Sequence, residues 1–481
     1  MKFTSLHRLP ATELSDRIWK GEITSRQATE SMLDRIADLD GTLRSYQLVT
    51  RDLALEQAGR ADEAVARGVR LGPLHGVPIA VKDLCFTRGI PTGAGTAVLQ
   101  DWCPGFDATV VQRLRDAGTV LLGKLKMTEG AWGAYHPRIA SPVNPWNADY
   151  WTGHSSSGSG VATAAGLCHV SVGSDTGGSI RYPAGANGLY GLKPTRDLVS
   201  LHGIFPMAPS LDHVGPIARS VRDIAAVLSV LAGEDPSDPA CLPRPSADYL
   251  GRLEPPRGGA AIATLSGSAR AEIHAEVRDA LERAESTLAA CGAKLHAVLG
   301  LEDFKEAARA WVLLAAPEIA RAHSAYYEVH KKCYGRSLAN LIEIGLQMQA
   351  TEMAAALEVR RRVVGHLQAL FGTYDFLLLP IQPMAPPRAE QIVKRSAEVD
   401  RSGPAMWFTA PFNLSGHPAL AMPAGRNPQG LPIGVQLIGP HSAEQRLLDL
   451  GSAYEASLGG PWQGPPEPLL ATSAPAHHRW T

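Results

Sequence analysis

The chain lacks the clustered cysteines, the charge imbalance and the long apolar runs that mark several protein classes. Its six cysteines are scattered singly, with no CxxC or His/Cys cluster, so neither a zinc site nor a disulfide framework is indicated. Lys plus Arg number 46 and Asp plus Glu number 47, so no overall field favours nucleic acid. No run of about 18 residues is continuously apolar, and the N-terminus has no signal-peptide core. We expect a cytoplasmic protein that binds neither membrane nor nucleic acid.

What the chain does contain is typical of a folded protein with a sizeable core. Of its 481 residues, 45% are hydrophobic and 19% are charged, which excludes a disordered chain. Glycine (47) and proline (36) are abundant, so we expect many tight turns and close backbone approaches.

In the first half of the chain, the pattern of apolar and polar residues changes near Gly72. Residues before this point have helical patterns, with a capping box at Thr24 and Gln27. After it, short apolar runs alternate with helical patterns and with Gly/Pro punctuation, which favours an α/β sheet with buried strands. The expected strands are Val77–Val81, Val120–Leu122 and Cys168–Val172, and the expected helices are Ala108–Ala117, Gly160–Gly166 and Val221–Leu231.

The second half of the chain leaves this pattern and then returns to it. From about Glu234 to Gly372 it is mainly helical, apart from a strand expected at Ala260–Thr264, and Glu352–Leu370 is an amphipathic helix. Strands are expected again at Phe376–Leu379, Ala419–Met422 and Ile433–Ile438. A chain that leaves a sheet and comes back predicts one large domain rather than three separate ones.

Three segments carry residues suited to nucleophilic catalysis. Lys82 ends the apolar run that begins at Val77, residues 153–160 read GHSSSGSG, and residues 173–181 read GSDTGGSIR. A serine hydroxyl needs a base to become a nucleophile, and a glycine turn can direct several N–H groups at an oxyanion. A lysine can be that base if burial lowers its pKa from about 10.4.

These segments resemble the amidase signature family of Ser–Ser–Lys hydrolases. That family has a loop close to GGSSGGS and a nucleophile turn close to GTDTGGSIR-P, followed by GLKPT. Here GHSSSGSG precedes GSDTGGSIRYP, residues 191–195 read GLKPT, and Ser155 and Ser179 are 24 positions apart as in the family. The resemblance continues through residues 210–216, 413–418 and 430–440, and covers about three-quarters of the chain. His154 and Ser157 stand where the family usually has glycine, so the shape of the loop and access to it can differ.

The resemblance implies an α/β fold in one large domain, with a twisted mixed sheet of roughly ten strands covered by helices on both faces. We expect it to be organised along the chain as N-terminal helices (1–70), the signature core (72–232), a mainly helical substrate-side region (234–372), C-terminal strands that rejoin the sheet (373–458) and a tail (459–481).

The resemblance also assigns the catalytic groups. Ser179 corresponds to the nucleophile, and Ser155 to the bridging serine that follows a cis peptide bond. Lys82 corresponds to the base that takes a proton through Ser155. No metal or cofactor is implied. The N–H groups expected in the oxyanion hole are those of Thr176, Gly177, Gly178 and Ser179.

Other residues are expected to support the site. Asp175 and Arg181 are expected to brace the nucleophile turn as an ion pair, and Ser156 to support the bridging serine. A stretch containing Trp132 falls where the family forms a substrate wall, although plain core packing fits it equally well. Its residues of interest are Met127, Thr128, Trp132 and Tyr135.

The variable region between about 300 and 410 is where the family builds most of its pocket. Its aromatic residues here suggest a hydrophobic site that accepts aryl groups. We also hypothesise that residues 386–404 form a mobile lid over this site. The aromatic residues are Trp311, Tyr326, Tyr327, Trp407 and Phe408.

The resemblance therefore predicts an amidohydrolase, a monomer or homodimer, that cleaves small or medium acyl amides, and also aryl amides, esters or carbamates. The alternative within the family is the glutaminase subunit of a tRNA-dependent amidotransferase, which would need a charged anchor for the glutamine carboxylate. A phosphate-binding protein is disfavoured because neither GxxxxGK[ST] nor GxGxxG occurs in the required context. Asp212 and His213 suggest a Ser-His-Asp triad, but adjacent residues on an extended chain point to opposite faces.

Overall fold

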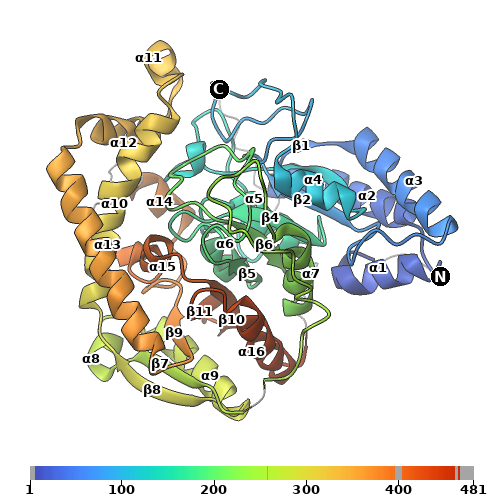
Figure 1. Ribbon diagram of the computed structural model, residues 1–481. Helices are drawn as coiled ribbons and strands as arrows, with labels where there is room; N and C mark the ends of the chain where they lie inside the picture. Colours follow the sequence, from blue (N-terminus) through green and yellow to red (C-terminus); the bar gives the residue numbers. More distant parts are fainter. Residues whose placement is uncertain (1–5, 257, 396–403, 461–463, 466–481) are drawn as a thin grey trace.

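A mixed β-sheet runs through the centre of the protein (Figure 1). The computed structural model describes residues 6–256, 258–395, 404–460 and 464–465. Across these residues eleven strands form one sheet in the order β1-β3-β2-β4-β6-β5-β10-β11-β9-β7-β8. The strands are β1 Tyr46–Val49, β2 Pro78–Lys82, β3 Val120–Leu125, β4 Val170–Ser174, β5 Tyr190–Lys193, β6 Val214–Ala218, β7 Ala261–Leu265, β8 Lys294–Leu299, β9 Phe376–Pro380, β10 Ala419–Arg426 and β11 Pro432–Ile438.

The sheet contains two parallel groups joined by antiparallel strands. Strand β2 pairs in parallel with β3 and β4, and β7 pairs in parallel with β8 and β9. Strands β6, β5, β10 and β11 connect the two groups through antiparallel pairs, and β1 adds an antiparallel edge to β3. The predicted mixed sheet of roughly ten strands, in a single large α/β domain, is therefore confirmed.

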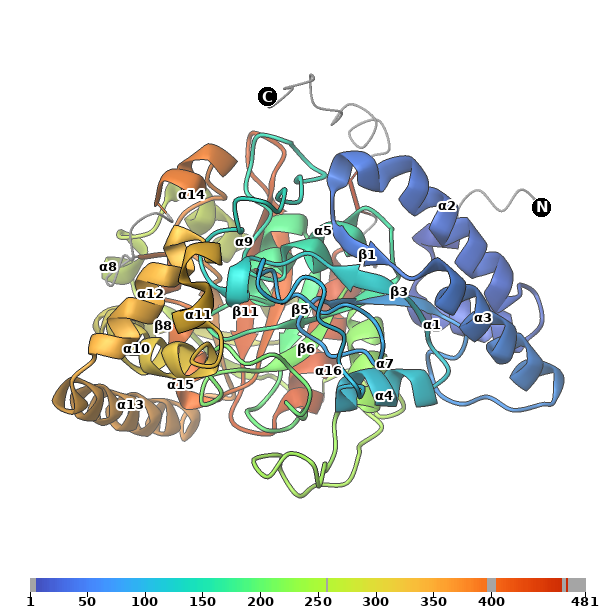
Figure 2. The same cartoon turned by 90° about the horizontal axis from the view of Figure 1, so that it is seen from above.

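Alternate residues of the central strands pack into different hydrophobic clusters, because successive side chains of a strand point to opposite faces. Ile79 and Val81 join the cluster that contains α7, whereas Ala80 joins the cluster that contains α5. The same alternation places Leu121 apart from Leu122. Helices therefore cover both faces, with α5 on one side of the sheet and α7 on the other (Figure 2).

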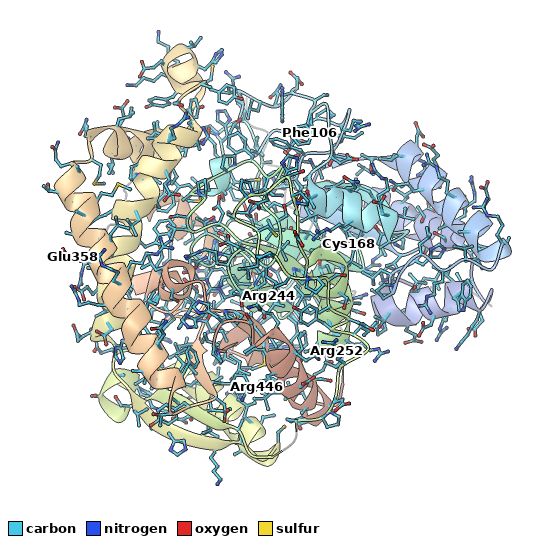
Figure 3. The ribbon with its side chains drawn as sticks, in the orientation of Figure 1. Phe106, Cys168, Arg244, Arg252, Glu358 and Arg446 are labelled. Carbon is cyan, nitrogen blue, oxygen red and sulfur yellow. The ribbon has the colours of Figure 1, made fainter. Side chains whose placement is uncertain are left out.

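Two groups of helices lie at opposite sides of the molecule. Helices α2 and α3 cover the end of the sheet at β3, and α10, α12 and α13 pack together beside α15 at the opposite side of the molecule (Figure 1). Glu358 lies on the solvent-exposed surface of α13 (Figure 3). The α-helices are α1 Ala11–Trp19, α2 Ser25–Leu43, α3 Arg51–Ala66, α4 Thr109–Asp116, α5 Ser157–Ala164, α6 Arg181–Asn187, α7 Val221–Leu231, α8 Gly267–Arg270, α9 Ala275–Ala290, α10 Glu302–Ala322, α11 Tyr327–His330, α12 Arg336–Gln347, α13 Ala350–Phe371, α14 Ala389–Arg395, α15 Ala410–Ser415 and α16 Glu444–Ser457.

Several local predictions are confirmed, and four strands were not expected from the sequence, namely β1, β5, β6 and β8. The capping box is present at the start of α2, where Thr24 and Gln27 satisfy each other's backbone N–H, and the bounds predicted for α7 are those observed. Strand β1 lies in a region expected to be helical, and β8 in one where only β7 was expected. Within the described segments, no helix is long and apolar enough to cross a membrane. Residues 396–403 of the hypothesised lid and most of the tail lie outside the described residues.

Candidate active site

Lys82 lies at the carboxyl end of β2, where all five residues of the strand are buried. Its Nζ donates hydrogen bonds to Ser155 Oγ at 2.7 Å and to Ser174 Oγ at 2.8 Å. Burial lowers the pKa of Lys82 from 10.5 to about 7, because desolvation penalises the ammonium form more than its neighbouring acidic groups stabilise it. A large fraction of such a lysine is neutral near pH 7, and a neutral amine can accept a proton.

The serine loop connects this lysine with the end of β4. The peptide bond between His154 and Ser155 is cis, as the family resemblance implied. Ser156 accepts a hydrogen bond from the Ser174 N–H at 3.3 Å and donates one to the Ser174 carbonyl at 3.1 Å. Ser156 therefore fixes Ser174, which is the second hydrogen-bond partner of Lys82. Ser174 was not singled out from the sequence.

Ser179 lies on the turn that follows β4 and is half-buried beside a cavity. The N–H of Ser156 donates to its carbonyl at 3.3 Å, so the serine loop lies directly against the turn. Within the described part of the chain, the Ser179 hydroxyl has no hydrogen-bond partner. Gly178 in the same turn has a φ of 129°, and a Cβ there would lie 2.4 Å from the Tyr182 ring, so this position requires glycine.

The carbonyl groups of the turn are held from outside it. Trp311 Nε1 of α10 donates to the Thr176 carbonyl at 2.7 Å, and Thr409 Oγ1 donates to the Gly177 carbonyl at 2.6 Å. Thr176 Oγ1 in turn donates to Asp212 Oδ1 at 2.5 Å. The Thr176 carbonyl belongs to the same peptide group as the Gly177 N–H, and the Gly177 carbonyl to the same peptide group as the Gly178 N–H. The hydrogen bonds to these two carbonyls therefore fix the orientation of both N–H groups.

The N–H groups of this turn differ in their availability. Those of Thr176, Gly177 and Ser179 donate no hydrogen bond to any other described residue. The N–H of Gly178 donates to Asp175 Oδ1 at 2.7 Å. Of the four N–H groups expected in the oxyanion hole, that of Gly178 is therefore already hydrogen-bonded to the Asp175 carboxylate, and the other three have no partner among the described residues.

A buried ion pair supports the turn from behind. Asp175 and Arg181 are fully buried, and the guanidinium contacts both carboxylate oxygens at 3.0 Å. Arg181 also donates to Gln436 Oε1 at 2.9 Å and to Asn413 Oδ1 at 2.7 Å. Burial opposes ionisation of Asp175, but the charge and hydrogen bonds of Arg181 hold the pKa of Asp175 well below its usual range, so this carboxyl group is ionised at neutral pH.

We expect Arg181→Met to destabilise the protein strongly, because it leaves a fully buried carboxylate without its cation. Loss of one partner of a buried pair costs about 3–5 kcal/mol in the free energy of unfolding. The matched control is Arg17→Met, which removes an exposed ion pair with Glu13 and is expected to cost less than about 1 kcal/mol. Urea unfolding of both variants measures the difference, and equal losses would contradict the bracing role of Arg181.

Ser179 opens onto a cavity of about 230 Å³. Of the predicted wall residues, Trp132 lines this cavity and Tyr135 lines a neighbouring one, whereas Met127 and Thr128 are buried and line neither. Of the five aromatic residues expected from the variable region, Trp311 lines the cavity, and it stacks on Trp132 at 5.7 Å. The described lining is Ala131, Trp132, Gly133, Trp151, His154, Gly177, Ser179, Tyr182, Met207, Trp311, Gln382, Met384, Pro387, Ile392, Ala405 and Met406.

The contacts of Asp212 and His213 exclude a Ser-His-Asp triad. The Asp212 carboxylate accepts hydrogen bonds from Thr176, Met207 and Ala208, and the His213 Nδ1 contacts the Leu211 carbonyl at 2.7 Å. Among the described residues, no three His, Cys, Asp or Glu side chains come together as metal ligands. The six cysteines are unpaired, and Cys168 is one of the three that are buried (Figure 3).

The fold and the combination of a buried lysine, two serine segments and a glycine turn define the class of enzymes that hydrolyse the C–N bonds of amides. The model of the family described as Amidase matches residues 27–448. The chain therefore belongs to this family, whose signature segments the sequence contains, and it is a hydrolase that acts on amides.

Its relatives cover nearly the whole chain. AmiD of Mycobacterium tuberculosis is 42% identical over 465 residues, which are 96% of this chain and 97% of that protein. A glutamyl-tRNA(Gln) amidotransferase subunit of Moorella thermoacetica is 38% identical over 477 residues, 94% of this chain and 97% of that protein. The solved structure of the peptide amidase from Stenotrophomonas maltophilia has a TM-score of 0.82 at 31% identity and covers 94% and 98% of the two chains.

Proposed function

We propose that the protein hydrolyses uncharged carboxamides through an acyl-enzyme on Ser179, with Ser155 and Lys82 as its proton relay. The observation that carries this proposal is the 2.7 Å hydrogen bond between Ser155 and a fully buried lysine whose pKa is lowered to about 7. The relay lies beside a turn whose serine opens onto a cavity. Esters and carbamates are substrates of the same chemistry, because only the groups on either side of the carbonyl differ.

In the first step the Ser179 oxygen forms a bond with the amide carbon. Its proton passes to the Ser155 oxygen while the Ser155 proton passes to the neutral Lys82 amine, so one positive charge is stored on the lysine. The carbonyl oxygen becomes an oxyanion. The free N–H groups of Thr176, Gly177 and Ser179 stabilise it, and the loss of one such donor typically costs about 10²–10³ in rate.

In the second half of the cycle the relay runs in reverse. Lys82 returns its proton through Ser155 to the amide nitrogen, the C–N bond breaks and the amine leaves. Water then enters, gives a proton to the same relay and attacks the acyl-enzyme. Collapse of this second tetrahedral intermediate releases the carboxylic acid and returns the proton to Ser179, which restores the starting state.

The substrate preference follows from the lining of the cavity. Among its described residues none carries a formal charge, and the polar members are Gln382, Tyr182, His154 and Ser179. Burial lowers the pKa of His154 to about 3, so this imidazole is neutral. Free glutamine would bring an α-carboxylate and an α-ammonium into this lining without a partner, and an unpaired buried charge is costly. An uncharged amide is therefore favoured over glutamine.

The second candidate remains the glutaminase component of an amidotransferase, because a protein of that kind is among the relatives. We expect the purified chain to hydrolyse neutral anilides, esters and carbamates with kcat/KM at least about 100-fold above that for L-glutamine. A panel of p-nitroanilide, p-nitrophenyl ester, carbamate and glutamine substrates measures this ratio. Turnover of glutamine alone would reject the proposal in favour of the glutaminase.

A further inference from the structure

The cavity beside Ser179, here called the reactive cavity, adjoins a second one. The second cavity holds about 250 Å³, and its described lining is Ala134, Tyr135, His136, Pro137, Ile139, Ser141, Pro142, Tyr150, Trp151, Thr152, His154, Ala389 and Ile392. Three residues line both cavities and therefore form a shared wall: Trp151, His154 and Ile392. The two cavities therefore lie side by side across this wall.

His154 is the part of the wall closest in sequence to the catalytic groups. It directly precedes Ser155, and its ring packs edge-on against Trp151 at 5.2 Å and against Tyr135 at 5.9 Å. The second cavity therefore lies on the side of the reactive cavity where the serine loop passes. The turn that carries Gly177 and Ser179 lines the reactive cavity and is not in the described lining of the second one.

The Ser179 turn lines only the reactive cavity, whereas His154, next to Ser155, lines both. This difference between the two cavities determines which half of a substrate faces the second one. An amine leaves only after its nitrogen is protonated, and the proposed donor of that proton is Ser155. A general acid must be within hydrogen-bond reach of the atom that it protonates. The leaving nitrogen therefore lies toward residues 154–155, and a substituent on that nitrogen extends past His154. The acyl group occupies the remainder of the reactive cavity, toward Trp132, Trp311 and Met207.

The lining of the second cavity fits an uncharged aromatic group. Tyr135, Tyr150 and Trp151 supply aromatic faces, and none of the described lining residues carries a formal charge. The two histidines that line it, His136 and His154, both have their pKa lowered by burial and are neutral at physiological pH. A cavity of about 150 Å³ can hold benzene, so this space is large enough for a substituted aryl ring.

We propose that the second cavity binds the leaving group of the substrate, and that the enzyme acts on N-aryl amides in preference to primary amides. This inference rests on the proposed acyl-enzyme mechanism, because the position of the proton donor defines the leaving side.

A matched pair of variants tests the assignment. Ala389 lines the second cavity and Ala405 lines the reactive cavity, and both alanines are exposed, so we expect tryptophan at either position to narrow the cavity that the alanine lines without disturbing the core. The substrates form two series. In one, an acetyl group is constant and the amine is ammonia, methylamine, aniline or naphthylamine. In the other, the amine is aniline and the acyl chain lengthens from acetyl to octanoyl.

We expect Ala389→Trp to lower kcat/KM for the anilide about tenfold or more relative to acetamide, and to leave the dependence on acyl length unchanged. Ala405→Trp should do the reverse. Because the amine has left before deacylation, the decay of the acetyl-enzyme, followed by intact mass, should be the same in Ala389→Trp and wild type. Thermal unfolding midpoints close to that of the wild type confirm that both variants fold.

Two outcomes would overturn the inference. The first leaves the proposed function intact, and the second rejects the proposed function as well. If Ala389→Trp lowers the turnover of acetamide and anilide equally, or changes the dependence on acyl length, the second cavity does not hold the leaving group while the mechanism stands. If the wild type turns over no amide at all, the proposed function fails and the leaving-group assignment fails with it.

Discussion

Replacement of Lys82 by alanine is expected to lower kcat/KM for an anilide by about 10⁴-fold and to abolish its dependence on pH. In the wild type, kcat/KM should rise about tenfold per pH unit in acid and level off above about pH 7, because only neutral Lys82 accepts a proton. The direction follows from the burial of Lys82, which lowers its pKa from 10.5 to about 7. Initial rates between about pH 5 and pH 9 measure both effects.

The control for this experiment is Lys126→Ala. Lys126 is half-buried near the serine loop, but its Nζ contacts the Ala140 carbonyl at 3.3 Å and no catalytic group. This variant should retain both the rate and the midpoint of the wild-type profile. A wild-type profile that is flat through neutral pH, or a Lys82→Ala variant with the wild-type profile, would reject Lys82 as the base.

Replacement of Ser179 by alanine is expected to lower kcat by about 10⁴- to 10⁶-fold, since it removes the atom that forms the acyl-enzyme. Substrate binding should change little, because Ser179 Oγ has no partner among the described residues and alanine leaves the turn intact. Single-turnover kinetics and a substrate Kd from equilibrium dialysis separate the two effects.

Ser159→Ala is the matched control for this variant. Ser159 is a fully buried serine of α5 whose hydroxyl has no hydrogen-bond partner among the described residues. Loss of its hydroxyl should leave kcat close to the wild-type value. Comparable losses in the two variants would mean that Ser179 has no special role.

The local elements could be predicted from the sequence where the pattern is strong and local. Helix α7 begins at a serine cap and has a continuous apolar face, and both signals lie within the segment itself. Strand β8 has neither signal. Four of its six residues are exposed and it lies at the edge of the sheet, so its formation depends on the parallel partner β7 rather than on its own pattern.

The residues of the candidate site also fall into two groups. Some lie in short sequence motifs, and others meet the site only through contacts made by the folded chain. Lys82, Ser155 and Ser179 can be proposed from the sequence because they lie in short motifs, and the structure brings their segments together. The bracing pair Asp175 and Arg181 could also be predicted from the sequence, but not the hydrogen bonds that hold the turn from other elements, because these contacts cross long stretches of chain. Trp311, expected only as a pocket residue, reaches Thr176 across 135 residues, and Thr409 reaches Gly177 across 232. A motif identifies a turn but does not contain the partners that orient it. The occupied N–H of Gly178 is a further detail that only coordinates reveal.

Activation of Ser179 by the buried Lys82 can be tested by intact-mass analysis after treatment with an aryl sulfonyl fluoride. This reagent forms a stable sulfonyl ester with an activated serine and does not depend on the choice of substrate. We expect one adduct on the wild type, formed more slowly as the pH falls below about 7, and none on Ser179→Ala. The same adduct on Ser179→Ala, or no adduct on a folded wild type, would show that Ser179 is not the activated nucleophile.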